Sequence, residues 1–295
     1  MQPFSLPSFA KINWTLRVLG KRDDGFHELV TVFQTVSLCD ILYFAESEKL
    51  ELTCEDAAIP TDERNLIIQA AKALQGIAGI DKGAFIHLEK RIPSPGGLGG
   101  GSSNAAVALI GLARLWDVAV EESVFNEIAV ELGSDVPFFL RGGTAIGTER
   151  GEVIEPSDDR EASEMLIVTP DVNVSTRDAF AGLNSETLTN VDLNRILPVC
   201  REDAESIDPH HSVLINDFER SVFSAYPEIE RVKRTLIELG AAAAAMSGSG
   251  ASVFAVFDKK ETRQAAKKAL DHESTWRKFV VSTISRAEYS EALGI

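Results

Sequence analysis

A glycine-rich segment in the first half of the chain has the residue types best suited to binding an anion. Residues 96–101 are all glycine apart from Leu98. Glycine has no side chain to bury, so the main-chain N–H groups of such a segment can approach a ligand closely. Residues 102–104, Ser-Ser-Asn, are expected to cap a helix that runs to Trp116. Free N–H groups and the positive end of a helix dipole favour phosphate, although a flexible surface turn is the alternative.

The segment matches neither of two common nucleotide-binding signatures. A P-loop requires a lysine after its last glycine, and none follows Gly101. The dinucleotide-binding fingerprint fits loosely, and Glu121 and Glu122, near the expected acidic position, are predicted to begin a helix. A phosphate site here would therefore be of another type.

The strand predicted over residues 8–19 carries a cation and an amide on one face. Lys11 and Asn13 alternate with apolar residues that are expected to face a core. The pair could be functional, although a strand face open to solvent would have the same pattern.

Asp135 lies where the chain must leave a helix. The helix is predicted over residues 121–132, with Gly133 as its C-terminal cap and Pro137 preventing continuation. Apolar neighbours would partly desolvate the carboxylate, which suits a general base, although Asp is also a common capping residue.

Two further segments could face a ligand. The turn over residues 20–27 delivers Phe26 and His27 to a strand, and an aromatic ring beside a histidine suits a base-stacking or sugar site. A lone histidine is, however, more often structural. Residues 247–250, Ser-Gly-Ser-Gly, predict a hairpin tip that either lets a ligand approach closely or forms a simple tight turn.

Composition excludes several classes of function. The chain has 295 residues, 44% of them hydrophobic, and a net charge of −16, which argues against a nucleic-acid or anionic-membrane surface. The 3 cysteines have no metal-binding spacing and are expected to be reduced. Neither a membrane-spanning run nor a signal peptide is evident, so a cytoplasmic location is expected.

The remaining pattern predicts two domains, residues 1–155 and 156–295, divided at a polar, proline-containing segment. Residues 184–212 are expected to be a loop-rich insertion, and the chain is expected to finish with a helix and a strand. Other predicted strands cover residues 28–38, 41–54 (two short strands of a meander), 85–90, 142–152 (a hairpin), 253–257 and 279–284, and other predicted helices cover residues 65–74, 217–224, 228–239 and 261–271.

Three blocks together resemble a known family. Residues 11–13 (Lys-Ile-Asn), residues 93–106 around the glycines, and residues 247–251 are similar, in this order, to the motifs of the small-molecule kinases named for galactose, homoserine, mevalonate and phosphomevalonate, the GHMP kinases. Blocks at residues 24–29 and 133–139 resemble one branch of that family, and the resemblance covers the whole chain.

The resemblance implies a two-domain α/β (α+β) fold, with an N-terminal domain like domain 2 of ribosomal protein S5 and a ferredoxin-like C-terminal domain. It implies that ATP binds in the cleft between them, with Mg²⁺. The implied reaction phosphorylates the 2-hydroxyl of 4-diphosphocytidyl-2-C-methyl-D-erythritol, in non-mevalonate isoprenoid precursor biosynthesis. The expected partners are these small molecules, with no nucleic acid or membrane, and the expected state is a monomer or weak homodimer.

The resemblance also implies residue roles. Asp135 would be the general base and Lys11 its neighbour, stabilising the alkoxide and the transferred phosphoryl group. His27 would hydrogen-bond the cytosine, with Phe26 and Phe180 stacked on either side. The implied ATP-binding residues are Pro95, Gly96, Gly97, Leu98, Gly99, Gly100, Gly101, Ser102, Ser103 and Asn104. The implied substrate-binding residues are Asn13, Phe26, His27, Thr176, Phe180, Ser247, Gly248, Ser249 and Gly250.

The chain departs from the family pattern at two places. Phe26 stands where many relatives have Tyr, which keeps stacking but loses a phenol hydrogen bond, and residues 247–250 lack a frequent Thr. The Mg²⁺ ligands are not evident, although Ser102 or Ser103 could contribute. Another GHMP-type kinase, or a catalytically inactive nucleotide-binding sensor, is the alternative function.

Overall fold

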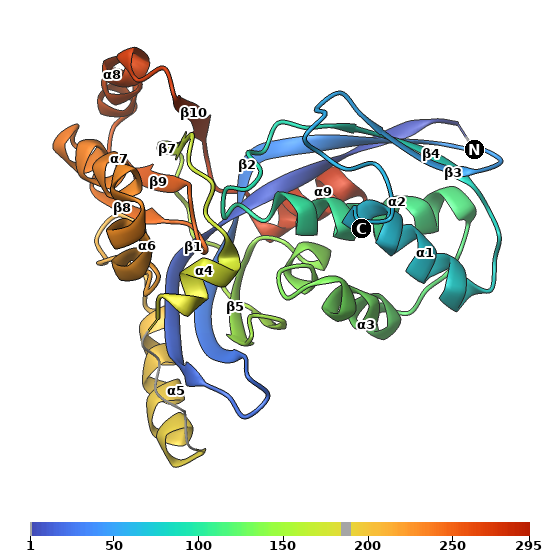
Figure 1. The fold of residues 1–295 in the computed structure, drawn as a ribbon, viewed down its shortest axis with the longest axis horizontal. Helices are drawn as coiled ribbons and strands as arrows, with labels where there is room; N and C mark the ends of the chain where they lie inside the picture. The colour runs from blue at the N-terminus through green and yellow to red at the C-terminus, as the bar shows by residue number, and fades with distance from the viewer. Residues whose placement is uncertain (1, 184–189) are drawn as a thin grey trace.

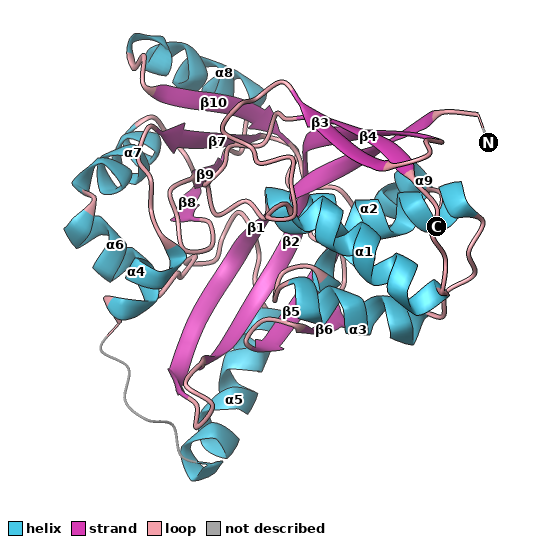
Figure 2. Ribbon diagram, turned by 45° about the vertical axis from the view of Figure 1, so that its right-hand side comes forward, coloured by secondary structure: helices cyan, strands magenta, loops and turns pink. Residues whose placement is uncertain are grey.

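Two β-sheets organise the chain, and helices pack against both (Figures 1 and 2). The computed structural model describes residues 2–183 and 190–295. The larger sheet has the strand order β3-β4-β2-β5-β6, with β1 also paired to β2, and the smaller has the order β10-β7-β9-β8. The strands are β1 (Phe4–Lys21), β2 (His27–Ala45), β3 (Leu50–Cys54), β4 (Ala84–Glu89), β5 (Thr144–Glu149), β6 (Val153–Pro156), β7 (Met165–Pro170), β8 (Ala243–Met246), β9 (Val253–Val256) and β10 (Trp276–Val281).

The helices divide between the two sheets. The core on one side of the larger sheet takes residues from α1, α2, α3, the short 3-10 helix η1 and α9. A second core, around the smaller sheet, takes residues from α4, α6, α7 and α8. The helices are α1 (Leu66–Ala78), α2 (Gly100–Trp116), α3 (Glu122–Leu132), η1 (Pro137–Leu140), α4 (Thr176–Ala181), α5 (Asn190–Glu205), α6 (Glu219–Ala225), α7 (Pro227–Glu238), α8 (Lys260–Ala269), η2 (Leu270–His272) and α9 (Arg286–Leu293).

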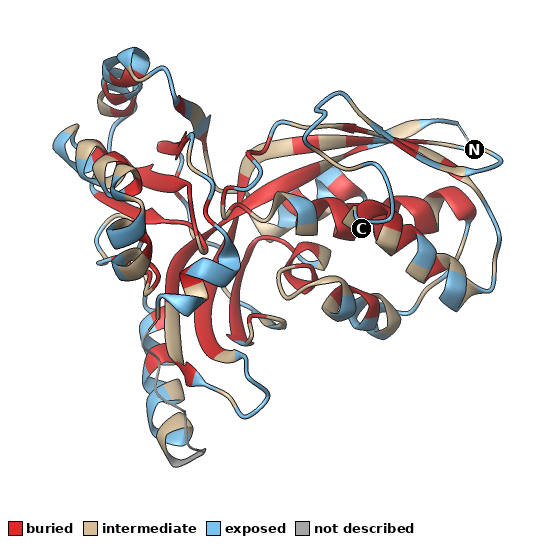
Figure 3. Cartoon of the chain, in the orientation of Figure 1, coloured by how far each residue is buried: buried red, intermediate tan, exposed pale blue. Residues whose placement is uncertain are grey.

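Strands β1 and β2 run through the centre of the molecule and contribute to both halves (Figure 1). Register shifts between Phe9 and Ala10 and between Asn13 and Thr15 interrupt their pairing, and such bulges bend and twist a strand. The apolar face of β1 packs against the smaller sheet, where the Trp14 and Phe254 rings meet edge to face at 5.4 Å. Figure 3 shows the central parts of both strands as buried. The predicted apolar core face of this strand is therefore confirmed.

The smaller sheet has the topology of a ferredoxin-like unit. Its four strands follow a β-α-β-β-α-β order along the chain, and the two edge strands, β10 and β8, are the fourth and second in sequence. All three of its strand pairs are antiparallel. In the described part of the chain, no helix is long and apolar enough to cross a bilayer.

Three sequence-based expectations about secondary structure are wrong. Residues 41–45 continue β2, and β3 pairs in parallel with β4, so no meander forms over 41–54. Residues 190–205 form α5 and not a loop, because the sparse apolar residues Leu197, Cys200 and Ala204 pack into the core between the two sheets. Residues 206–212 contain turns and no helix or strand, as expected, and residues 184–189 of that prediction lie outside the described residues.

The third difference is α9, which follows the last predicted strand. Its N-cap is Ser285, whose side chain accepts from the Glu288 N–H while the Glu288 carboxylate accepts from the Ser285 N–H. This capping box is readable in the sequence as Ser-x-x-Glu. The helix returns the end of the chain to the first core, where Tyr289 is fully buried.

Candidate active site

The two glycine-rich segments meet in the structure. The Ser247 hydroxyl donates to the Gly97 carbonyl at 2.9 Å, and the Ser252 N–H donates to the Gly96 carbonyl at 3.1 Å. Gly97 has φ +71°, and a Cβ there would overlap the Ser247 carbonyl oxygen. Both the backbone conformation and the close approach therefore require glycine at this position. Asn216 supports the second segment, because its Nδ2 donates to the Met246 and Gly248 carbonyls at 2.7 and 2.8 Å.

Helix α2 begins directly at the glycine loop. Its N-cap is Gly99, with φ +69° and no side-chain cap, so the expected cap at residues 102–104 is wrong. Gly99 has a left-handed backbone conformation and starts the helix before the expected cap. Residues 102–104 therefore lie within the first turns of α2. The first-turn N–H groups are thereby left without a side-chain acceptor, as an anion site requires.

Two of the residues expected at the phosphates point elsewhere. Ser103 and Asn104 are buried, and the Ser8 hydroxyl of β1 donates to Asn104 Oδ1 at 2.6 Å and lies 2.8 Å from Ser103 Oγ. Their side chains thus attach the helix to the sheet. Ser102 lines the cavity described below.

A buried ion pair lies beneath the loop and was not anticipated from the sequence. Lys90 Nζ donates to Asp40 Oδ2 at 2.8 Å, and Asp40 Oδ1 accepts the N–H groups of Arg91 and Ile92 at 2.7 Å each. Burial lowers the pKa of Lys90 from its usual value, while Asp40 opposes that shift. The pair fixes the segment that leads into the glycines. A lysine at a strand end carries no sequence signal for this role.

Lys11 and Asp135 face each other beside the loop. Their side chains approach to 3.3 Å, with Lys11 3% exposed and Asp135 34% exposed. Lys11 Nζ also donates to Asn13 Oδ1 at 2.8 Å, and the Gly248 N–H donates to the same oxygen at 2.9 Å. Lys11 and Asn13 are both buried beneath the two glycine segments. The alternative interpretation, that this face of the strand is exposed to solvent, is therefore excluded.

The position of Asp135 follows from the aromatic residues after it. The turn between α3 and η1 is closed by the Val136 N–H donating to the Gly133 carbonyl at 3.0 Å. Phe138 is fully buried and stacks on Phe33 of β2, with ring centroids 4.9 Å apart. This anchored turn leaves the carboxylate at the surface of the cavity, within reach of the lysine.

The other side of the site is aromatic. The His27 and Phe180 rings lie 5.0 Å apart at 30°, while Phe26, which is 54% exposed, faces the Arg150 guanidinium at 5.0 Å. Thr176 Oγ1 and Ser249 Oγ, 3.0 Å apart, join α4 to the second glycine segment. Burial, and secondly the positive charge of Lys21, lower the pKa of His27 from its usual value, so the neutral ring is favoured.

One cavity of about 700 Å³ joins these parts. All of the residues expected at the site line it except Ser103, Asn104 and Ser247. The volume lies within the range of small-molecule pockets. Arg150, Arg177 and Leu66 also line it, and none was identified from the sequence.

No ready-made metal centre accompanies this cavity. Among residues 2–183 and 190–295, no group of three His, Cys, Asp or Glu side chains is placed to hold a metal ion. A Mg²⁺ ion bound through nucleotide phosphates and waters needs few protein ligands. Of the two serines expected to contribute to Mg²⁺ binding, Ser102 lines the cavity, whereas Ser103 is buried against Ser8.

A glycine loop at a helix N-terminus and a lysine–carboxylate pair in one cavity are typical of a phosphotransferase of the small-molecule kinase class. Family models match the chain at residues 65–143, for the GHMP kinases N terminal domain, and at residues 201–274, for the GHMP kinases C terminal domain. The chain belongs to the GHMP kinases, which are ATP-dependent kinases.

Individual relatives agree with this assignment. The chain is 39% identical over 94% of its length to the 4-diphosphocytidyl-2-C-methyl-D-erythritol kinase of Thermodesulfovibrio yellowstonii, and covers 97% of that protein. It is 41% identical over 88% of its length to the enzyme of the same name from Chlorobium limicola, covering 91% of it.

Solved structures confirm the expected two-domain α/β fold. A crystal structure of 4-(cytidine 5'-diphospho)-2C-methyl-D-erythritol kinase matches with a TM-score of 0.76 and 30% identity, over 95% of this chain and 99% of that one. The homoserine kinase of Cytophaga hutchinsonii, at 20% identity, matches with a TM-score of 0.67 over 97% of this chain and 96% of that one, a likeness of fold alone.

Proposed function

We propose that this chain transfers the γ-phosphoryl group of ATP to the 2-hydroxyl of 4-diphosphocytidyl-2-C-methyl-D-erythritol, within non-mevalonate isoprenoid precursor biosynthesis. The relatives that carry this activity in their names match nearly the whole chain. The single observation that carries the proposal is one cavity that contains the glycine loop, the Lys11–Asp135 pair and the His27–Phe180 pair.

The phosphate end of the cavity supports ATP binding. Residues 96–102 present main-chain N–H groups and the start of α2 to the cavity. Phosphoryl transfer depends mostly on positioning and on stabilising developing negative charge. The N–H groups would hold the nucleotide phosphates, and buried Lys11 would add a full positive charge at the transferred group. Mg²⁺, carried with ATP, would neutralise phosphate charge.

Asp135 would act as the general base. It is the acidic side chain paired with Lys11, and as a partly exposed carboxylate it can accept a proton from a hydroxyl that enters the cavity. Lys11 balances the negative charge that develops on the acceptor oxygen. Asn13 holds Lys11 through a 2.8 Å hydrogen bond and itself accepts from the Gly248 N–H, so the second glycine segment contributes to the position of the catalytic pair.

The aromatic end supports a nucleobase-containing acceptor. Base–aromatic stacking is favourable, and a neutral imidazole can both donate and accept a hydrogen bond. The centroids of the His27 and Phe180 rings are 5.0 Å apart, so one nucleobase can contact both rings. Phe26 is exposed beside them. Thr176 and Ser249 add hydroxyl groups on the same side.

A coupled assay of ADP release tests the proposal. The purified chain would be given ATP, Mg²⁺ and, in turn, diphosphocytidyl-methylerythritol, methylerythritol phosphate, homoserine and mevalonate. We expect turnover of the cytidyl compound alone. Turnover of another acceptor would keep the kinase activity and remove the proposed substrate, and ATP binding without turnover of any acceptor would indicate a nucleotide-binding sensor.

A further inference from the structure

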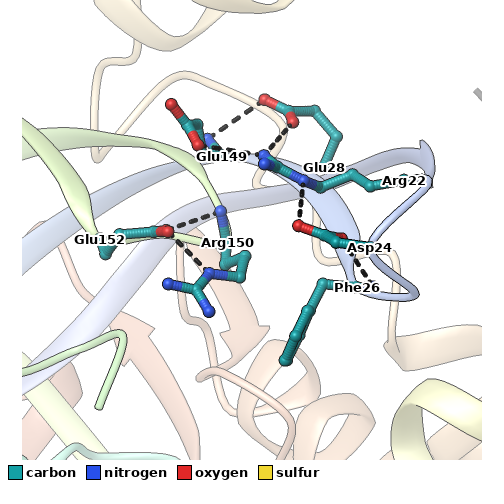
Figure 4. Close-up of polar contacts among 7 residues, drawn as sticks. All are labelled: Arg22, Asp24, Phe26, Glu28, Glu149, Arg150 and Glu152. Atoms are coloured by element: carbon teal, nitrogen blue, oxygen red, sulfur yellow. Dashed lines mark hydrogen bonds and ion pairs between the residues drawn. The ribbon is translucent and has the colours of Figure 1, made fainter. Parts of the chain in front are cut away.

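A charged cluster centred on Arg22 joins two turns at the rim of the cavity (Figure 4). One turn, residues 22–26, connects β1 to β2 and presents Phe26. The other, residues 150–152, connects β5 to β6 and presents Arg150. The two turns are far apart in the sequence, and the cluster connects their side chains in addition to the contact of the Phe26 ring with the Arg150 guanidinium at 5.0 Å.

Arg22 is the centre of the cluster. Its Nη1 donates to Glu28 Oε2 at 2.8 Å and to Glu149 Oε2 at 3.2 Å, and its Nε donates to Asp24 Oδ2 at 3.2 Å. The Glu28 side chain is only 5% exposed. A buried carboxylate without a partner is costly, so Glu28 requires the guanidinium, and the guanidinium is held at one place by Glu28.

The first turn has a defined shape but needs an external anchor. The Phe26 N–H donates to Asp24 Oδ1 at 3.0 Å, and the Arg22 N–H donates to the Phe26 carbonyl at 2.7 Å. These bonds lie within the turn and do not fix where it stands relative to the cavity. The contact from Arg22 to Glu149 crosses to the other turn and does so.

The Glu28 carboxylate also orients the second turn. The Glu149 N–H donates to Glu28 Oε1 at 3.2 Å, and Glu149 has φ +60°, an unfavourable backbone conformation for a residue with a side chain. The next residue, Arg150, is held by Glu152, which accepts from the Arg150 N–H at 2.8 Å and from its Nε at 2.7 Å. Glu28 therefore fixes the point at which the chain turns Arg150 towards Phe26.

We propose that Arg22, together with buried Glu28, is a positioning residue that holds the Phe26–His27 turn against the Glu149–Glu152 turn and so sets affinity for the acceptor but not for ATP. Arg22 itself does not line the cavity, whereas Phe26, His27 and Arg150 do. The part of this inference that concerns the acceptor rests on the proposed function. The ordering of the two turns does not.

The kinetic test compares Arg22→Gln with the wild-type chain and with Arg234→Gln. Arg234 is a matched control, because it forms an exposed ion pair with Glu238 on α7. Arg22→Gln should raise the acceptor KM roughly 3- to 30-fold, because loss of the charge-assisted contacts lets the turn adopt conformations that do not bind. The kcat and the KM for ATP should stay within about twofold of wild type, a split that general destabilisation would not produce.

Two further variants test the mechanism. Arg22→Lys should recover part of the acceptor affinity, because an ammonium keeps the charge but lacks the second donor, Nε, with which Arg22 bonds Asp24 while its Nη1 bonds Glu28 and Glu149. In the double variant Arg22→Gln with Glu28→Gln, the acceptor KM should rise less than the two single increases combined predict. The reason is that the double variant leaves no buried charge without its partner. Additive effects would contradict the assigned pairing.

Hydrogen exchange measured without any substrate separates this inference from the proposed function. Arg22→Gln should speed amide exchange in residues 22–27 and 149–152 and leave α2 unchanged. If exchange accelerates but no cytidyl acceptor is phosphorylated by the wild-type chain, the positioning role stands and the proposed substrate is wrong. Unchanged exchange in both turns, or equal increases in the two KM values, would overturn the inference.

Discussion

At the scale of single residues, Lys11 and Asp135 are the pair on which the proposed chemistry depends. Their side chains are 3.3 Å apart, and Lys11 is held by Asn13 while Asp135 is held by a turn anchored in the core. A fixed cation next to a carboxylate that keeps one third of its surface exposed suits proton transfer from an incoming hydroxyl.

Replacing Asp135 tests this role. Asp135→Asn keeps the shape and removes the base, so kcat should fall by roughly 10²–10⁴ while ATP binding is nearly unchanged. Steady-state kinetics and titration calorimetry with ATP measure the two effects. The exposed Asp81, changed to Asn, is the control, and wild-type turnover in Asp135→Asn would remove Asp135 from the mechanism.

Replacing His27 tests the acceptor side. His27→Ala should raise the acceptor KM roughly 3- to 10-fold, the value of one lost hydrogen bond, and leave the KM for ATP unchanged. Both constants come from the same ADP-release assay. A weakened ATP interaction with an unchanged acceptor KM would show that this turn does not serve the acceptor.

The pH dependence of acceptor binding follows from the same ring. Because burial lowers the pKa of His27, the neutral ring is present at neutral pH and persists below the usual histidine value of about 6.5. Acceptor KM should therefore be constant from about pH 8 to pH 6.5 and rise only at lower pH, as protonation removes the ring's acceptor nitrogen. His27→Gln should abolish that rise, and a rise that remained in His27→Gln would assign it to another group.

At the scale of elements, the two glycine segments act as one structure. The first segment opens α2, and the second is the tip of the β8–β9 hairpin, so the contact at Gly97 joins a helix of one half to a hairpin of the other. Backbone approach of this kind places N–H groups from two elements around one point.

Adding a methyl group at this contact should separate the segments. Gly97→Ala requires φ +71° for alanine and an overlap with the Ser247 carbonyl, so we expect a loss of about 1–3 kcal/mol of stability and a higher KM for ATP. Gly76→Ala in α1, where a Cβ would meet nothing within 4 Å, is the control and should be neutral or stabilising. Thermal unfolding and kinetics of both variants provide the measurement, and equal behaviour would contradict the close contact.

At the scale of the whole molecule, the last helix returns to the core of the first half. Figure 1 shows the C-terminus beside α1 and α2, and Arg114 of α2 donates to the Leu293 carbonyl at 2.5 Å. Tyr289 fills the space over Gly142, and its hydroxyl donates to the Phe139 carbonyl at 2.6 Å. The end of the chain therefore supports the segment that follows Asp135.

The division of the chain into domains of residues 1–155 and 156–295 stays a prediction.

Removing the Tyr289 ring should destabilise the first half of the molecule. Tyr289→Ala should cost about 3–5 kcal/mol through the cavity it leaves, and Tyr289→Phe about 1 kcal/mol through the lost hydrogen bond. Tyr43→Phe, at a half-exposed position on β2, should have little effect. Urea unfolding gives the three values, and a Tyr289→Ala chain as stable as wild type would exclude this packing role.

From the amino-acid sequence alone, the glycine loop, the buried strand face and most of the helices can be predicted. These follow from local rules: glycine frees the backbone between Gly96 and Gly101, alternation marks β1, and Asn65 and Ser175 are polar residues that cap their helices. Even the missed helix α9 carries a local signal, because Ser285 and Glu288 form a capping box.

Which polar residues face the cavity depends on how the elements pack together. Ser103 and Asn104 follow the glycines in sequence, yet their side chains bond Ser8, because the helix turns them towards the sheet. Helix α5 is stabilised mainly by what it packs against, and Arg22 and Glu28 meet Glu149 only because β2 pairs with β5. Burial and contact between distant segments are properties of the folded chain, and they decide where each charge finds its partner.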